Sequence, residues 1–216
     1  MDPVEGAAEQ PAAPVEAAEV SPYNIANAIT LFRLALVPVF GTLLMAQAGE
    51  RPSLRYAATA VFVVASYTDR IDGQIARARG LVTSFGKLAD PIADKALIGT
   101  ALVGLSVLGE LPVAVTLIIV LREVGVTVLR LVVIRHGVIP ASRGGKVKAL
   151  LQAVAIGLYL LPLTGAPASA RAGVMALATV VTVVTGLDYV ARAVTLRRTS
   201  ARAQSKRARR SARVTP

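Results

Sequence analysis

The sequence predicts an all-α, polytopic membrane protein with six transmembrane helices. Hydrophobic residues make up 54% of its 216 residues, whereas soluble domains average about 45–50%. The excess is concentrated in Ala/Val/Leu/Ile runs whose lengths approach the 20 or so residues that cross about 30 Å of hydrocarbon. Turn-forming residues separate these runs. The predicted spans are residues 28–48, 55–78, 88–109, 111–135, 147–164 and 170–193.

The distribution of basic residues predicts the orientation of these spans. With a cytoplasmic N-terminus, the outer turns receive only Arg51, Arg55 and Arg171. The inner loops then receive Arg70, Arg77, Arg79, Lys87, Arg135, Arg143, Lys146 and Lys148. Because cytoplasmic loops carry the excess of Lys and Arg, we expect both termini in the cytoplasm.

The two ends of the chain differ from the apolar region, which we define as a six-helix membrane domain at 23–193. Residues 1–22 hold five acids and no base, are rich in Ala and Pro, and are predicted to be disordered. Residues 192–216 hold nine basic residues and no acid. Because this basic segment directly follows an apolar stretch, a cytoplasmic tail at 194–216 that contacts anionic lipid is favoured over one that binds nucleic acid.

Composition restricts the chemistry of any site. The chain has no cysteine and a single histidine, His136, which excludes thiolate and histidine-cluster metal sites. Carboxylates must therefore hold any metal, and oxygen ligands favour a hard cation such as Mg²⁺ or Mn²⁺.

Four aspartates lie in one short window. Asp69 and Asp72 are spaced i,i+3 at the end of the second predicted span, and Asp90 and Asp94 are spaced i,i+4 at the start of the third. Each spacing places its pair on one face of a helix. Clustered carboxylates near a membrane repel one another, and two divalent cations would balance four of them. The alternative is an acidic vestibule or four unrelated charges at helix ends.

The window D-x2-D-G-x2-A-R-x8-G-x3-D-x3-D resembles the signature of the CDP-alcohol phosphotransferases. The matching positions are Asp69, Asp72, Gly73, Ala76, Arg77, Gly86, Asp90 and Asp94. The resemblance implies a six-helix fold, a homodimer, a cavity open to the cytoplasm, and transfer of a phosphatidyl-type group from a CDP-linked donor to an alcohol with release of CMP.

The resemblance also implies roles for these residues. Asp69, Asp72, Asp90 and Asp94 would hold two divalent cations, and Asp94 would also be the catalytic general base. The CDP-lipid would be bound by Asp69, Gly73, Ala76, Arg77 and Gly86, with Arg77 on a phosphate.

A second group of residues bears on the acceptor. Arg122 and Arg130 lie in the fourth predicted span, and Lys146 and Lys148 open the fifth after Gly144-Gly145. Cations within a membrane indicate a functional site, here a pocket for the phosphate of an acceptor or product. For Arg122 a structural ion pair with Glu123 stays open. Thr30 and Arg33 either face the cavity or cap the first helix.

Several further segments are similar to the bacterial phosphatidylglycerophosphate synthases. They are residues 24–33 with Pro38, residues 122–130, Gly145-Lys146-Val147-Lys148, and Gly186-Leu187-Asp188-Tyr189. This resemblance implies CDP-diacylglycerol as donor and sn-glycerol 3-phosphate as acceptor, places Tyr189 beside the acceptor or product phosphate, and implies the plasma membrane of a bacterium.

Two other interpretations remain. One is a sister phosphatidyltransferase that uses inositol phosphate or phosphatidylglycerol as acceptor. The other is a divalent-cation transporter, because charges within helices also mark ion pathways. A transporter would distribute its acids over several spans, whereas four of the six acids in the spans and inner loops surround a single turn.

Overall fold

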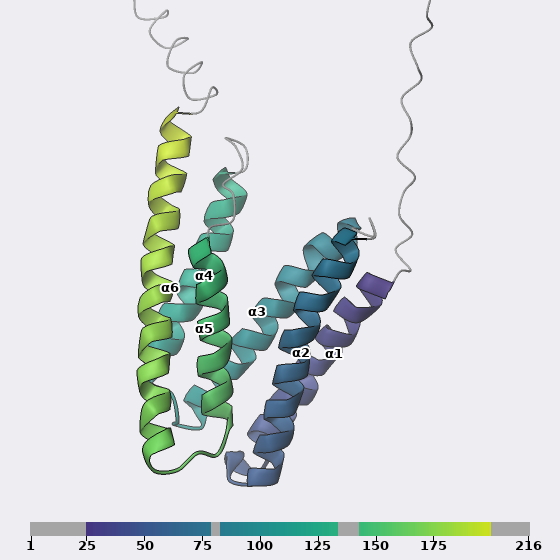
Figure 1. Ribbon diagram of the computed structural model, residues 1–216, viewed down its shortest axis with the longest axis vertical. Coiled ribbons are helices and arrows are strands. Elements are labelled where there is room, and N and C mark those ends of the chain that lie inside the picture. The colour runs from purple at the N-terminus through teal and green to yellow at the C-terminus, as the bar shows by residue number, and fades with distance from the viewer. Residues whose placement is uncertain (1–24, 79–82, 134–142, 200–216) are drawn as a thin grey trace, which may run out of the picture.

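The computed structural model describes residues 25–78, 83–133 and 143–199, and these residues form six α-helices. The number matches the six predicted apolar stretches. The helices are α1 (Ile25–Met45), α2 (Pro52–Ala78), α3 (Ser84–Val107), α4 (Val113–Val133), α5 (Arg143–Leu160) and α6 (Ala166–Thr199), with a short 3₁₀ turn, η1 (Ala46–Gly49), after α1. Successive helices alternate in direction, so that α1 begins and α6 ends at the upper end of the molecule in Figure 1.

Most helix boundaries differ from the predicted spans by a few residues, as α5 and α6 illustrate. The fifth helix runs over Arg143–Leu160, and so Gly144 and Gly145 lie in its first turn instead of breaking the chain before it. It ends early because Pro162 cannot donate a helical hydrogen bond. Helix α6 continues to Thr199, beyond the predicted end of the apolar stretch at 193.

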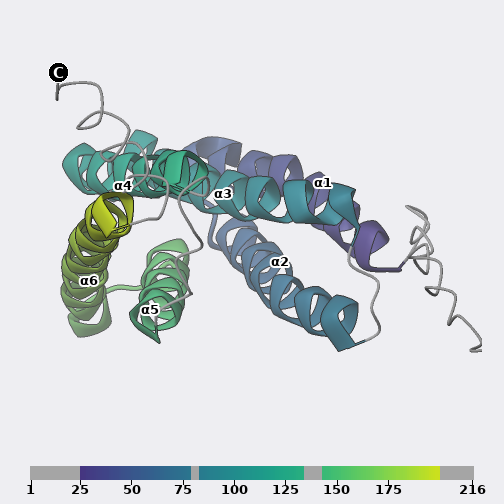
Figure 2. The same ribbon diagram turned by 90° about the horizontal axis from the view of Figure 1, so that it is seen from above.

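The helices form two groups that meet at a cavity. Helix α1 packs against α2 and α3, α6 packs against α4 and α5, and fewer contacts through α2–α5, α3–α4 and α3–α5 join the groups. Seen from above, α1, α3 and α4 lie along one side and α2, α5 and α6 along the other (Figure 2). Residues of α2, α3, α4 and α5 line the cavity.

Close packing between α1 and its neighbours fixes the first group. Phe40 and Phe62 contact each other with ring centroids 5.7 Å apart, and both are buried. Gly104 lies directly against Leu44, because a Cβ built on it would be 2.6 Å from a leucine methyl carbon. A side chain at this position would therefore separate α1 from α3.

The outer surface of the helices is apolar. Two segments, Asn27–Gly49 and Ala166–Arg197, are long and apolar enough to cross a membrane, and only 22% of the apolar window of each is buried. Such exposure is unlike the core helix of a soluble protein. Every one of the six helices also exposes large apolar side chains, such as Phe32, Val64, Val103, Leu121, Val154 and Leu187. Apolar surface of this extent is typical of contact with lipid.

Ion pairs connect the helices at the end opposite the cavity. Arg55 of α2 is buried, forms an ion pair with Glu110, and donates to the carbonyl oxygens of Leu160 at 3.0 Å and Tyr159 at 2.6 Å. Arg171 of α6 is 3.2 Å from Glu110 and lies over the Tyr159 ring at 4.7 Å. This far-end network, Arg55, Glu110, Tyr159, Leu160 and Arg171, joins α2, the α3–α4 turn, α5 and α6.

Candidate active site

The start of α3 is held against α1. Thr83 caps the helix, since its hydroxyl accepts a hydrogen bond from the backbone N–H of Gly86 at 3.0 Å and donates one to Asn27 at 2.8 Å. A Cβ on Gly86 would lie 3.0 Å from the Asn27 side-chain oxygen. The glycine of the signature therefore permits the close approach of α1 and α3. Whether it also contacts a nucleotide stays a prediction.

Asp90 is oriented by two side chains of α1. The hydroxyl of Thr30 donates to Asp90 Oδ1 at 2.7 Å, and Arg33 donates to the same oxygen at 3.2 Å. Arg33 is fully buried, whereas the Asp90 side chain is 42% exposed. Thr30 and Arg33 thus orient Asp90, although neither residue is among those that line the cavity beside Asp94.

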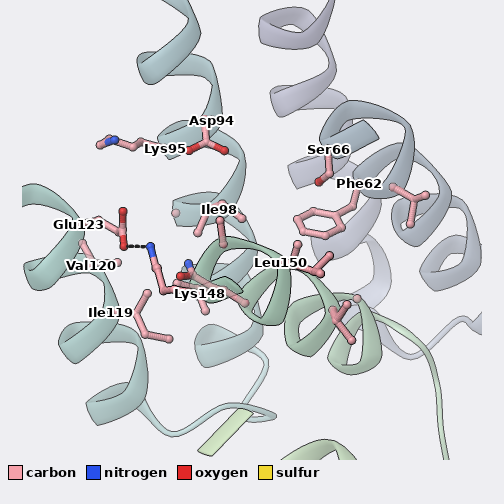
Figure 3. Close-up of a pocket in the computed structure, with 18 of the residues that line it drawn as sticks. Phe62, Ser66, Asp94, Lys95, Ile98, Ile119, Val120, Glu123, Lys148 and Leu150 are labelled. Carbon is pink, nitrogen blue, oxygen red and sulfur yellow. Dashed lines mark hydrogen bonds and ion pairs between the residues drawn. The ribbon is translucent and has the colours of Figure 1, made fainter. Parts of the chain in front are cut away.

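Asp94 lies one turn further along α3 and lines a cavity of about 380 Å³. It has no hydrogen bond or ion pair with any side chain that the structure describes. Figure 3 shows its carboxylate beside Lys95, across from Glu123 and Lys148. A carboxylate without a protein partner at the edge of a cavity is available to a proton or a cation.

The second pair of aspartates lies near the end of α2. Asp69 and Asp72 are in the helix, as are Gly73, Ala76 and Arg77, but their side chains are outside the described part of the structure, as is the whole of His136. Among the described side chains no three acidic or histidine residues meet. That search does not include Asp69 and Asp72, so the convergence of the four carboxylates stays a prediction.

The described carboxylates nevertheless fit a divalent cation. Asp90 accepts both of its hydrogen bonds on Oδ1, so that no described donor takes Oδ2. Asp94 lies on the same face of α3. Hard cations bind such carboxylate oxygens, and hydrogen bonds from neighbours such as Thr30 and Arg33 are the usual means of orienting a ligand carboxylate.

The cavity also contains a buried cation. The Lys148 side chain of α5 is 8% exposed and forms an ion pair with Glu123 of α4, drawn as a dashed line in Figure 3. Glu123 is also 3.1 Å from Arg122. Among the charged residues that line the cavity, Asp94 and Glu123 balance Lys95 and Lys148, so the lining has no net charge and Lys148 is its buried cation.

The other predicted cations lie outside this cavity lining. Arg122 is directed toward α6, where it donates to the Thr182 carbonyl and to the Thr185 hydroxyl, both at 3.1 Å. Gly186 makes room for it, because a Cβ there would be 3.0 Å from Arg122 Cγ. The ion pair with Glu123 that the sequence left open is also present, and a role of Arg122 at the acceptor phosphate stays a prediction.

Arg130 and Lys146 also lie outside the cavity lining. Arg130 lies over the Tyr189 ring at 5.8 Å from its centroid, and Lys146 is exposed near the start of α5. A role of either residue at the acceptor phosphate stays a prediction.

The sequence interpretation missed Gln152. This α5 residue is 3% exposed and lines the cavity, and no residue in the described part of the chain forms a hydrogen bond with its side-chain oxygen. The available signal was an amide four residues after Lys148 in an otherwise apolar stretch, a spacing that places both on one helix face.

Comparison with known proteins identifies the family. The model of the CDP-alcohol phosphatidyltransferase family matches residues 23–184. A probable phosphatidylglycerophosphate synthase of Mycobacterium tuberculosis (strain H37Rv) is 58% identical over 170 residues, which cover 79% of this chain and 81% of that protein.

More distant relatives carry related names. The CDP-diacylglycerol–glycerol-3-phosphate 3-phosphatidyltransferase of Bacillus subtilis (strain 168) is 39% identical over 64% of this chain and 77% of its own length. A CMP-forming cardiolipin synthase of Streptomyces coelicolor is 34% identical over 54% of each chain. The family match spans most of the sequence, including all eight signature positions, and the chain belongs to the CDP-alcohol phosphatidyltransferase family.

Proposed function

We propose that this protein transfers the phosphatidyl group from CDP-diacylglycerol to sn-glycerol 3-phosphate, giving phosphatidylglycerophosphate and CMP. The observation that carries the proposal is the cavity where Asp94 of α3, which pairs with no described side chain, lies across from the buried cation Lys148 of α5. The names of the M. tuberculosis and B. subtilis relatives support the same reaction, and family membership favours it over the divalent-cation transporter.

Asp69, Asp72, Asp90 and Asp94 are the proposed ligands of two divalent cations, Mg²⁺ or Mn²⁺. When bound, these cations neutralise charge on the pyrophosphate and orient the CMP leaving group. Within the protein, Thr30 and Arg33 fix the rotamer of Asp90 through the bonds to Oδ1. Arg77 binds a phosphate of the donor, with Gly73, Ala76 and Gly86 along the nucleotide.

Asp94 is the proposed general base. The C1 hydroxyl oxygen of the acceptor forms a bond to the phosphorus that bears the lipid, and the phosphorus–oxygen bond to CMP breaks. The hydroxyl proton passes to the Asp94 carboxylate. The absence of a hydrogen-bond partner for Asp94 among the described side chains leaves its oxygens available for this proton.

Lys148 is the proposed primary contact of the acceptor phosphate, because it is the predicted cation that lines the cavity. Arg122 supports the site from α4 through Glu123, which it shares with Lys148. Arg130, Tyr189 and Lys146 would guide the acceptor or product phosphate at the cytoplasmic edge.

We further propose that all six helices cross the plasma membrane of a bacterium, with both termini and the active site cytoplasmic. Two helices meet the length and composition required of a span, and exposed apolar side chains on all six support the rest. The alternating directions place the start of α1 and the end of α6 at the same end of the molecule (Figure 1). Homodimerisation is an expectation from the family alone.

An acceptor panel tests the reaction. Purified protein in detergent with CDP-diacylglycerol and Mg²⁺ or Mn²⁺ is given sn-glycerol 3-phosphate, inositol phosphate or phosphatidylglycerol, and CMP release is measured. We expect turnover with glycerol 3-phosphate. Turnover confined to inositol phosphate or to phosphatidylglycerol would reject the proposed acceptor, and the second result would agree with the cardiolipin synthase relative.

A further inference from the structure

We propose that Gln152 is a specificity-determining residue that binds the C2 hydroxyl of a glycerol phosphate acceptor. This inference rests on the proposed function, since it names the group on that acceptor which the cavity recognises. The Gln152 amide would add an uncharged hydrogen bond to the contacts of Asp94 and Lys148 with the acceptor.

The observation behind the proposal is a buried amide without a partner. Gln152 is 3% exposed, and its Oε1 accepts no hydrogen bond from any described residue. The side chain lines the same cavity as Asp94 and Lys148. A buried polar atom almost always has a partner, and an unpartnered amide oxygen on a side chain that lines a cavity indicates that a ligand or water is its partner.

The position of Gln152 suits a small three-carbon acceptor. It follows Lys148 by four residues on α5, so the two side chains leave the same helix face about 6 Å apart along the axis. Asp94 faces the cavity from α3, on the side shown opposite Lys148 in Figure 3. A phosphate at Lys148 and a reacting C1 hydroxyl at Asp94 would leave the C2 hydroxyl beside the α5 amide.

Neighbouring residues make this hydroxyl contact selective. The rest of the cavity lining is largely apolar and includes Phe62, Leu102 and Ile119. The unpartnered Gln152 atom is an acceptor, and it requires a donor. A hydroxyl donates and also accepts, and it therefore satisfies the amide in either orientation. The diacylglycerol part of the lipid donor offers only ester oxygens, which cannot donate.

The test compares two acceptors in the same preparation. One is sn-glycerol 3-phosphate, and the other is 3-hydroxypropyl phosphate, which keeps the phosphate and the reacting hydroxyl but lacks the C2 hydroxyl. A site built to bind a hydroxyl rejects an analogue without it. We expect the wild type to prefer glycerol 3-phosphate by about tenfold or more in kcat/KM.

Gln152→Met keeps the length of the side chain and removes the amide. We expect kcat/KM for glycerol 3-phosphate to fall about tenfold, kcat/KM for 3-hydroxypropyl phosphate to stay near wild type, and KM for CDP-diacylglycerol to be unchanged. Partial unfolding lowers both activities equally and leaves their ratio unaltered. Gln152→Leu repeats the measurement if the first variant does not purify.

Thr182→Val is the matched control. The Thr182 hydroxyl is also buried and lacks a hydrogen-bond partner in the described structure, but it lies on α6 and does not line the cavity. We expect this variant to keep the wild-type preference between the two acceptors. The same loss of preference in Thr182→Val would assign the effect to packing and overturn the proposal.

Two further results would overturn the inference. One is an equal loss of activity per folded molecule on both acceptors in Gln152→Met, and the other is a raised KM for CDP-diacylglycerol with the acceptor preference intact. A failure of the proposed function is distinguishable, because the wild-type protein would then show no turnover with glycerol 3-phosphate.

Discussion

The two ends of this helical protein use buried charge in different ways. In the far-end network, Arg55 and Arg171 share Glu110, and the remaining donors of Arg55 meet the last carbonyl oxygens of α5. At the cavity end, Asp94 has no partner among the described side chains and Gln152 leaves an oxygen unpaired. Paired charges connect helices, whereas unpaired polar groups around a cavity indicate ligand binding.

A second contrast lies within the cavity end itself. Asp90 is held by Thr30 and Arg33 of α1, but no described side chain holds Asp94, one turn away on the same helix. A carboxylate that neighbouring side chains orient is suited to be a metal ligand, because the coordination geometry must be kept. A carboxylate without such hydrogen bonds is suited to be a general base, because it must take up a proton. The predictions below test these distinctions in order of expected effect.

Substitution of Asp94 should have the largest effect. We expect Asp94→Asn to lower kcat by about 10³-fold, because an amide cannot accept the acceptor's proton, while the protein still binds CDP-diacylglycerol. CMP release and equilibrium binding of the donor are the measurements. Glu50→Gln, an exposed acid in the turn at the opposite end, is the control and should behave as wild type. Normal turnover in Asp94→Asn would refute the base assignment.

Breaking the far-end network should affect stability instead of chemistry. Arg55→Met leaves partly buried Glu110 with Arg171 alone, and we expect the free energy of unfolding to fall by about 3 kcal/mol. Denaturant titration in detergent measures this change, and kcat per folded molecule should be retained. A variant with normal stability and lost activity would show that the far end, too, takes part in function.

Loss of the Thr30 hydroxyl should weaken metal binding. We expect Thr30→Val to raise the Mg²⁺ concentration for half-maximal activity about tenfold, since groups that orient a ligand carboxylate influence metal affinity by that order. Direct titration with Mn²⁺, followed by electron paramagnetic resonance, provides a readout independent of turnover. An unchanged Mn²⁺ affinity would contradict the role of α1 in holding Asp90.

The exposed pair of α6 should show the smallest effect. Asp188 and Arg192 are 2.8 Å apart, but their side chains are 48% and 58% exposed. We expect Asp188→Asn to change the free energy of unfolding by less than about 0.5 kcal/mol, because water screens such pairs. If the free energy of unfolding fell as much as in Arg55→Met, pairing, and not burial, would determine how much an ion pair contributes to stability.

Much of the architecture was predictable from local sequence. Apolar runs and the turn residues between them predicted six helices, and the described residues form six. The exact ends were less predictable, as α5 shows: two glycines suggested a break, but the helix includes them and stops before Pro162. Helix ends depend on caps and on the following residues as much as on apolarity.

The site was predictable in part. The sequence alone determined the family signature, the carboxylate spacing, and the kind of cation that oxygen ligands can hold, because those depend on residue identity and helix periodicity. Only the tertiary structure decided that Thr30 and Arg33 reach Asp90, that Arg122 is directed to α6 while Lys148 enters the cavity, and that Gln152 is left unpartnered. These contacts join residues on different helices, and no local pattern specifies which side chains meet when the helices pack.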